Sequence, residues 1–239
     1  MRTPYGLEII ENCLVCPHRE ERLFCDLPSA AAQTLAKITS SATYPKGATL
    51  FVQGQDSRGV FILCNGRVKL STTTADGQSL IARVSRSGDV LGLPATVTGR
   101  PYELSAEVIE PTQANFISRS DFLQFLHDNS EAALRVAQQL AEFYQNAIGE
   151  MRTIGLTRSA AEKLARFLLN QLPEGGDRKD QIKLTLTFTH EEIGQMLGAS
   201  RETISRTFAE LKRRKLIQVK GSSITIVSRD ALEKLAPVP

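Results

Sequence analysis

Short apolar segments broken by glycine fill the first half of the chain, and this pattern predicts β-strands. Asp76-Gly77 is the best hairpin signal, because both residues tolerate positive φ. Strand character returns over residues 102–118. Many short strands at near-regular spacing predict a β-sandwich or β-roll. The other expected strands are 49–53, 59–63, 67–73 and 79–84, with turns at Gly54, Gly66 and Gly88.

Helical spacing predicts short helices at 28–40 and 120–127 and a longer helix after them. Asn129 or Ser130 can accept hydrogen bonds from the first free N–H groups of the long helix. Its apolar stripe alternates steps of four and three, the heptad pattern of a coiled-coil contact, so we expect a second copy to pack there. The alternative is a helix packed on its own β-domain. The stripe comprises Ala133, Ala137, Leu140, Tyr144, Ala147, Met151 and Ile154.

A second region follows Gly155, and its pattern predicts a helix-turn-helix. Thr189 and Glu192 have the spacing of a capping box, which starts a helix at about His190. Gly198 supplies the backbone freedom of a tight turn, and Ser200 can cap the next helix. An ordinary helical hairpin is the alternative. Around this motif we expect a helix at 160–172, a polar loop at 173–180, a strand at 182–188, a second helix at 201–212 and a two-stranded wing at 216–219 and 223–227.

The second helix carries candidate DNA-reading residues on its outer face, where a recognition helix meets the major groove. Arg206 can donate to guanine O6 and N7 together, and Glu202 can accept from a cytosine amine. Arg201 and Ser205 complete the expected base-reading set. Thr189, His190, Lys212, Arg213 and Lys220 are expected at phosphates, which position a protein without reading sequence.

Charge agrees with a polyanion partner at one end of the chain. The formal net charge is +3, yet residues 1–155 carry 14 basic and 16 acidic residues against 15 and 10 in residues 156–239. Seven basic and two acidic residues lie in 201–220 alone. Such a patch is typical of nucleic-acid binding, with a solvated helix face as the plain alternative.

Other function classes lack sequence support. There is no apolar run of about 18 residues and no secretory leader, so we expect a cytoplasmic protein without a membrane partner. Three scattered histidines, with no Gly-rich phosphate loop or nucleophile elbow, do not indicate an enzyme. A binding module built around the β-domain alone would need a filled pocket near 88–106, and its polar residues do not form a convincing site.

Two pairs of segments carry a family resemblance. The C-terminal pair is EEIGQMLG at 191–198 with SRETISR at 200–206, and the β-domain pair is GVFILCNGRV at 59–68 with GDVLG at 88–92. Over nearly its whole length the chain resembles the CRP/FNR family, that of the cAMP receptor protein and the fumarate–nitrate regulator. The resemblance implies an α+β fold: a cyclic-nucleotide-binding-like β-roll, a long dimerisation helix and a C-terminal winged helix-turn-helix.

The resemblance also implies partners. A homodimer would bind a palindromic operator with half-sites one helical turn apart, and RNA polymerase would be contacted. Arg201, Glu202 and Arg206 stand at base-reading positions, and the family favours a TGA core. The expected divisions are a cysteine-containing segment at 1–27, the sensor β-roll at 28–128, the dimerisation helix at 129–155 and the DNA-binding domain at 156–239.

The sequence leaves several alternatives for the signal that the N-terminal domain would sense. Leu93 and Leu104 stand where cAMP-binding members place a carboxylate and an arginine, with Arg100 and Glu103 off register, so cAMP is not expected.

Cys13, Cys16 and Cys25 are candidate ligands of a metal or an iron–sulfur cluster, which usually takes four thiolates. Asn115, not cysteine, aligns with the fourth ligand of the oxygen-sensing members. Thiol oxidation, purely structural cysteines and a small effector in the β-roll are the alternatives. His18 is a ligand or a surface residue, and Cys64 reads as a buried strand cysteine.

Overall fold

The computed structural model describes residues 4–10, 13–22, 24–156, 159–172 and 182–236, without the side chains of residues 4, 15, 150 and 152–156. The predicted loop at 173–180 therefore lies outside the described residues, as does the side chain of Ile154. The chain forms two compact units, Met1–Gln145 and Asn146–Pro239, which are described separately.

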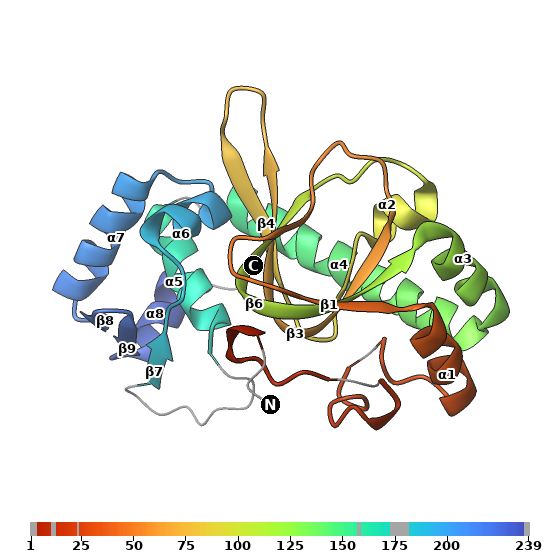
Figure 1. Ribbon diagram of the computed structural model, residues 1–239. Coiled ribbons are helices and arrows are strands. Elements are labelled where there is room, and N and C mark those ends of the chain that lie inside the picture. Colours follow the sequence, from red (N-terminus) through yellow and green to blue (C-terminus); the bar gives the residue numbers. More distant parts are fainter. Residues whose placement is uncertain (1–3, 11–12, 23, 157–158, 173–181, 237–239) are drawn as a thin grey trace. The chain divides into compact units, whose positions relative to one another are not determined.

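A six-stranded antiparallel sheet forms the body of the first unit (Figure 1). Its strand order is β1-β6-β3-β4, with β2 paired to β6 and β5 paired to β3. The strands curl into a roll, as the short-strand pattern predicts. Their bounds are β1 Ser40–Tyr44, β2 Thr49–Phe51, β3 Gly59–Thr73, β4 Ser79–Arg86, β5 Val90–Leu91 and β6 Ser105–Ser118.

One prediction in this sheet is wrong. Gly66 was expected to separate two strands, yet β3 runs continuously through it. Gly66 has a φ of +86° among several register shifts between β3 and β6. A Cβ there would lie 2.3 Å from the carbonyl oxygen of Pro111. The glycine therefore permits an irregularity that bends a long strand, and it does not reverse the chain.

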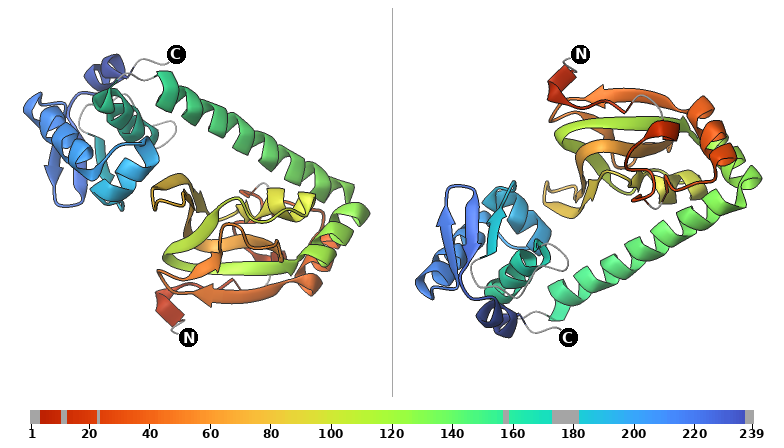
Figure 2. Two further views of the ribbon diagram at one scale, coloured as in Figure 1. Left: turned by 90° about the horizontal axis from the view of Figure 1, so that it is seen from above. Right: turned by 90° about the horizontal axis from the view of Figure 1, so that it is seen from below.

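Helices cover one end of the roll. α1 (Ser29–Ile38), α3 (Arg119–Asp128) and the start of α4 (Ser130–Leu156) gather there, as Figure 2 shows. Short 3₁₀ turns, η1 (Pro4–Gly6) and η2 (Cys13–Val15), lie in the N-terminal segment. α2 (Leu93–Thr98) was not predicted: it is a six-residue helix between two glycines with positive φ, too short for a periodic signal.

The alternation of β3 supplies two cores. Val60 and Ile62 pack with α1, α3 and α4 on the outer face. Phe61 and Leu63 point into the roll and pack with residues of β2 and β6. One strand therefore joins the interior of the roll to its helical cover.

The second unit is a helical domain with a three-stranded sheet of order β7-β9-β8. Its core includes Leu164, Ile193, Ile204 and Leu211, all fully buried. Strand β7 ends at Thr185, short of the predicted 188, and α8 was not predicted. The elements are α5 Ala160–Asn170, β7 Ile182–Thr185, α6 His190–Leu197, α7 Arg201–Arg213, β8 Ile217–Lys220, β9 Ser223–Ile226 and α8 Arg229–Leu235.

Within the described residues, no helix combines the length and the apolar character that a bilayer span requires.

Candidate functional site

The first helix of the predicted DNA-binding motif begins with the expected capping box. The Thr189 hydroxyl accepts from the backbone N–H of Glu192 at 3.2 Å. The Glu192 carboxylate accepts in return from the backbone N–H of Thr189 at 2.8 Å. Two N-terminal donors of α6 are thereby satisfied, which fixes the start of the helix at His190.

The turn between α6 and α7 depends on two glycines. Gly198 ends α6 in the left-handed conformation with φ +62°. Gly194 lies inside α6, and a Cβ there would stand 2.5 Å from the carbonyl oxygen of Ala199. The Ala199 N–H also donates to the Gly194 carbonyl at 2.9 Å. Sequence reasoning singled out Gly198 and missed Gly194, although a glycine inside an otherwise regular helix was the available signal.

Helix α7 buries one face and presents the other. Ser200 caps it by accepting from the Thr203 N–H at 3.2 Å. Ile204, Phe208 and Leu211 are buried in the core of the second unit. Three of the four predicted base-reading residues, Arg201, Glu202 and Arg206, are exposed. Their placement allows direct contact with a groove that receives α7.

The Glu202 carboxylate is held in its charged form. Hydrogen bonds from its own backbone N–H and from the Ser200 hydroxyl lower its pKa, and the charges of Arg201 and Arg206 lower it further. An ionised carboxylate accepts hydrogen bonds only. Glu202 is therefore a hydrogen-bond acceptor under the influence of two neighbouring cations, Arg201 and Arg206.

The fourth predicted base-reading residue, Ser205, lies differently. Its hydroxyl is 2.9 Å from Nδ1 of His190, and Ser205 is only partly exposed. The His190 ring stacks on Phe208 with centroids 4.7 Å apart and an interplanar angle of 8°. His190, predicted as a phosphate contact, thus joins α6 to α7.

The remaining predicted phosphate contacts are all exposed. Thr189 is exposed at the start of α6, while Lys212 and Arg213 end α7. Lys220 lies at the tip of the β8–β9 hairpin, next to Gly221 with φ +61°. The wing is therefore the two-stranded hairpin that the sequence predicts.

Helix α4 divides its apolar residues between two faces. Ala132 and Val136 are buried against the roll, and Leu140 also packs on that core. The polar Gln139 is buried on the same face, where its Nε2 donates to the Val90 carbonyl at 3.5 Å. The predicted stripe otherwise faces outward: Tyr144 and Met151 are 69% and 67% exposed. Ala137 and Ala147 are exposed too, and Ala133 is half-buried. One face of α4 therefore packs on its own domain while a neighbouring face lies free.

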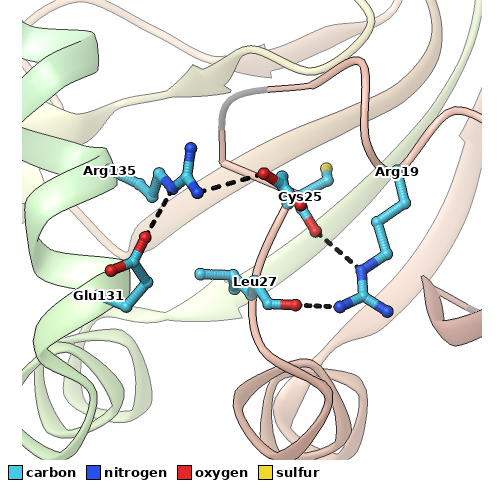
Figure 3. Close-up of polar contacts among 6 residues, drawn as sticks. Arg19, Cys25, Leu27, Glu131 and Arg135 are labelled. Carbon is cyan, nitrogen blue, oxygen red and sulfur yellow. Dashed lines mark hydrogen bonds and ion pairs between the residues drawn. The ribbon is translucent and has the colours of Figure 1, made fainter.

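The N-terminal cysteine segment is tied to the start of α4 (Figure 3). The Arg19 guanidinium donates to the backbone carbonyls of Cys25, at 3.3 Å, and of Leu27. Arg135 of α4 reaches the Asp26 carboxylate at 3.2 Å and Glu131 at 3.1 Å. Cys25 therefore lies between an arginine of its own segment and an ion pair to α4.

The cysteine thiols are shielded from solvent to different degrees. Burial raises the pKa of Cys25 to about 11 and that of Cys64 to about 12. Burial also raises the pKa of Cys13, whose sulfur accepts from Asn115 Nδ2 at 3.4 Å. In the described part of the chain, no three His, Cys, Asp or Glu side chains already stand in the arrangement of a metal site. The metal site at Cys13, Cys16 and Cys25 stays a prediction, and His18 pairs with Glu21 on the surface.

The positions expected to decide cyclic nucleotide binding hold apolar side chains. Leu93 is fully buried in the core shared with α1, α3 and α4. Leu104 is half-buried at the approach to β6, and Arg100 and Glu103 are exposed. Leu93 therefore serves packing, and supplies no carboxylate to a ligand.

Comparison with known proteins gives two family matches. Residues 42–129 match a cyclic nucleotide-binding domain, and residues 162–235 match a Crp-like helix-turn-helix domain. The fumarate and nitrate reduction regulatory protein of Vibrio cholerae is 31% identical over 197 residues, which are 81% of this chain and 77% of the relative. A CRP-like cAMP-activated global transcriptional regulator of Mycobacterium tuberculosis is 26% identical over 210 residues, 87% of this chain and 93% of the relative.

A solved structure supports the fold. FixK2 from Bradyrhizobium japonicum superposes with a TM-score of 0.72 at 24% sequence identity, covering 84% of this chain and 99% of that one. At this identity the likeness concerns the fold alone.

Proposed function

The chain belongs to the CRP/FNR family of transcription regulators, and on that premise we propose that it binds palindromic DNA as a homodimer with α7 in the major groove. The observation that carries the proposal is the outer face of α7. Two arginines flank an ionised carboxylate there, on a helix fixed by a cap at its start and by a packed inner face.

The roles of individual residues follow from their chemistry. Arg206 is proposed to read guanine with its planar fork, and Glu202 to accept from cytosine. Arg201 contacts a base or a phosphate. Lys212, Arg213 and Lys220 are proposed to neutralise phosphates, and Thr189 to contact a phosphate without neutralising it. Ser205 and His190 support α7 through their mutual hydrogen bond.

The second copy is proposed to pack along the exposed stripe of α4. Tyr144 and Met151 are large apolar side chains with most of their surface in solvent. Alanines at 133, 137 and 147 let a second backbone approach closely. A two-fold dimer on a palindrome gives each half-site one α7, which is how the symmetry of protein and operator correspond. Contact with RNA polymerase is carried over from the resemblance.

Fluorescence anisotropy with full-length protein tests this function. One labelled duplex carries two TGA half-sites one helical turn apart, and a second carries the same sequence with the G·C pair of each half-site replaced. We expect tighter binding to the first duplex at every salt concentration, with affinity falling steeply as salt rises. Equal affinity for both duplexes would contradict sequence-specific recognition, and weak salt dependence would contradict phosphate contact.

A further inference from the structure

Two amide side chains lie on the outer face of β6. Ala114 and Phe116 pack inside the roll, whereas Ile117 packs in the outer core with the helices. Because side chains alternate along a strand, Gln113 and Asn115 lie on the same outer face as Ile117. Only 0% of Gln113 and 5% of Asn115 is exposed. Both amides are therefore buried outside the interior of the roll.

The two amides differ in how fully their hydrogen-bonding groups are used. The Gln113 side chain accepts from the N–H of Ile10 and donates to the Ile10 carbonyl, both at 2.8 Å, and it also donates to the Ser41 hydroxyl at 3.1 Å. Asn115 donates through Nδ2 to the Cys13 sulfur at 3.4 Å. Its Oδ1 atom is buried and has no hydrogen-bond partner within the described structure. A buried oxygen of this kind costs free energy until a further group donates to it.

A pocket of about 460 Å³ lies against Asn115. The N-terminal segment, α1, β1 and β6 line it, and all of them belong to the first unit. Small-molecule sites in proteins typically have volumes of about 300–1,000 Å³. The pocket therefore has room for an organic molecule beside a side chain with an unused acceptor.

The lining of the pocket combines apolar groups with one charge. Ile10, Leu14 and Ala36 supply the apolar part. Lys37 is the charged side chain among the described lining residues, and it has no ion-pair partner in the described part of the chain. A ligand carboxylate finds its counter-ion at Lys37, and a ligand hydroxyl or ammonium is the kind of donor that an amide oxygen accepts from.

We propose that this pocket binds a small carboxylate that carries a hydroxyl or amino group and an apolar body about the size of a phenyl ring. The carboxylate pairs with Lys37, the apolar body packs on Ile10, Leu14 and Ala36, and the hydroxyl or amino group donates to Asn115 Oδ1. Because Oδ1 is closed to solvent, the Asn115 amide turns or Cys13 moves aside when the ligand enters. The site goes beyond the proposed function and does not depend on it.

Calorimetric titration of the full chain with three matched compounds tests the site. Phenyllactate and phenylalanine each carry a donor next to the carboxylate, whereas hydrocinnamate has the same carboxylate and ring without the donor. We expect phenyllactate or phenylalanine to bind about two- to tenfold more tightly than hydrocinnamate, which is the contribution of one hydrogen bond. The difference between phenyllactate and phenylalanine shows whether the donor is a hydroxyl or an ammonium group.

Two substitutions test the polar contacts. Asn115→Leu removes the acceptor at similar volume, so the preference over hydrocinnamate should disappear, a ratio that a merely weakened pocket would not change. Lys37→Gln should weaken all three compounds alike, by about two- to fivefold for an exposed ion pair. Lys46→Gln is the matched control, because Lys46 is exposed and does not line the pocket.

A third substitution fills the pocket and leaves its polar groups in place. Ala36→Leu should abolish binding of all three compounds, because the longer side chain occupies the apolar part of the pocket. Ala30→Leu adds the same side chain at an exposed position of α1 outside the pocket, and it should bind as the wild type does. Thermal unfolding of both variants verifies that α1 remains folded.

Three results would overturn the site. They are a wild-type chain that gives no heat of binding with phenyllactate or phenylalanine, a preference over hydrocinnamate that survives Asn115→Leu, and unchanged binding in Ala36→Leu. DNA binding is measured on the same preparations. A chain that binds the ligand but does not recognise the palindrome contradicts the proposed function and supports the pocket, and the reverse result contradicts the pocket alone.

Discussion

Helices α7 and α4 each bury one face, and they differ in what the free face offers. The free face of α7 carries Arg201, Glu202 and Arg206, whereas that of α4 carries Tyr144, Met151 and alanines. A charged face with fixed geometry suits a polyanion that supplies its own hydrogen-bonding groups. An apolar face in solvent is stabilised most when a second apolar face covers it and excludes water. The contrast supports the proposal that DNA binds at α7 and a second copy at α4.

The largest effect is expected from a charge placed on the apolar face. Ala137→Arg would bring two arginines together across a two-fold contact, and such like-charge juxtaposition costs several kcal/mol. We expect the variant to sediment as a monomer in analytical ultracentrifugation. Gln138→Arg is the control, because Gln138 is exposed on another side of α4. A dimer that survives Ala137→Arg would move the interface away from this stripe.

The next largest effect is expected at the turn between α6 and α7, which positions the charged face of α7. Gly194→Ala forces a Cβ to within 2.5 Å of the Ala199 carbonyl, so α6 and α7 must separate. We expect a loss of about 1–3 kcal/mol in the free energy of unfolding.

Gly149→Ala provides a control, because its effect on the free energy of unfolding is expected to have the opposite sign. Gly149 is a helical position in α4 where an added Cβ has nothing within 4 Å. We expect it to be neutral or to stabilise by up to about 1 kcal/mol. Thermal and urea unfolding of both variants measures the difference, and equal destabilisation would contradict the role given to Gly194.

The third effect distinguishes a base-reading residue of α7 from a phosphate-contacting residue of the same helix. Arg206→Ala should lose about 1–3 kcal/mol of DNA-binding free energy and relax the preference for the TGA duplex. Lys212→Ala should weaken both duplexes alike and lower the salt slope by about 1. Titrations at several salt concentrations distinguish the two patterns. An unchanged preference in Arg206→Ala would remove Arg206 from the readout.

The smallest effect concerns the hydrogen bond between α6 and α7. Ser205→Ala leaves His190 without its 2.9 Å partner, which should cost about 0.5–1.5 kcal/mol of stability and weaken both duplexes equally. Unfolding and anisotropy measurements on one preparation check this. Normal stability with altered preference at one base pair would instead give Ser205 the base-reading role that its place in the sequence suggests.

The helix-turn-helix was predictable because its signals are local. The capping box of Thr189 and Glu192, the turn at Gly198 and the cap at Ser200 each act within a few residues. Periodicity then fixes which side of α7 is buried. The need for glycine at 194 was not predicted, because the atom that leaves no room for a Cβ there is the Ala199 carbonyl oxygen, on the far side of the turn.

The first unit was less predictable because its contacts are long-range. β1 has a polar, mostly exposed sequence that carries little alternation, and its pairing with β6 decides that it is a strand. β3 looked like two strands because Gly66 resembles a turn residue, and only pairing with β6 shows one bent strand.

The sequence by itself determined the family, the recognition helix and the exposed residues of α7, because caps, turns and helical spacing are local properties of the chain. Tertiary structure alone decided which apolar residues of α4 are buried, that Ser205 faces His190, and that Asn115 of β6 contacts Cys13 of the N-terminal segment. These depend on strand register and on the path of a segment across a sheet, where residues distant in sequence become neighbours. Spacing along the chain carries no information about such contacts until the sheet is formed.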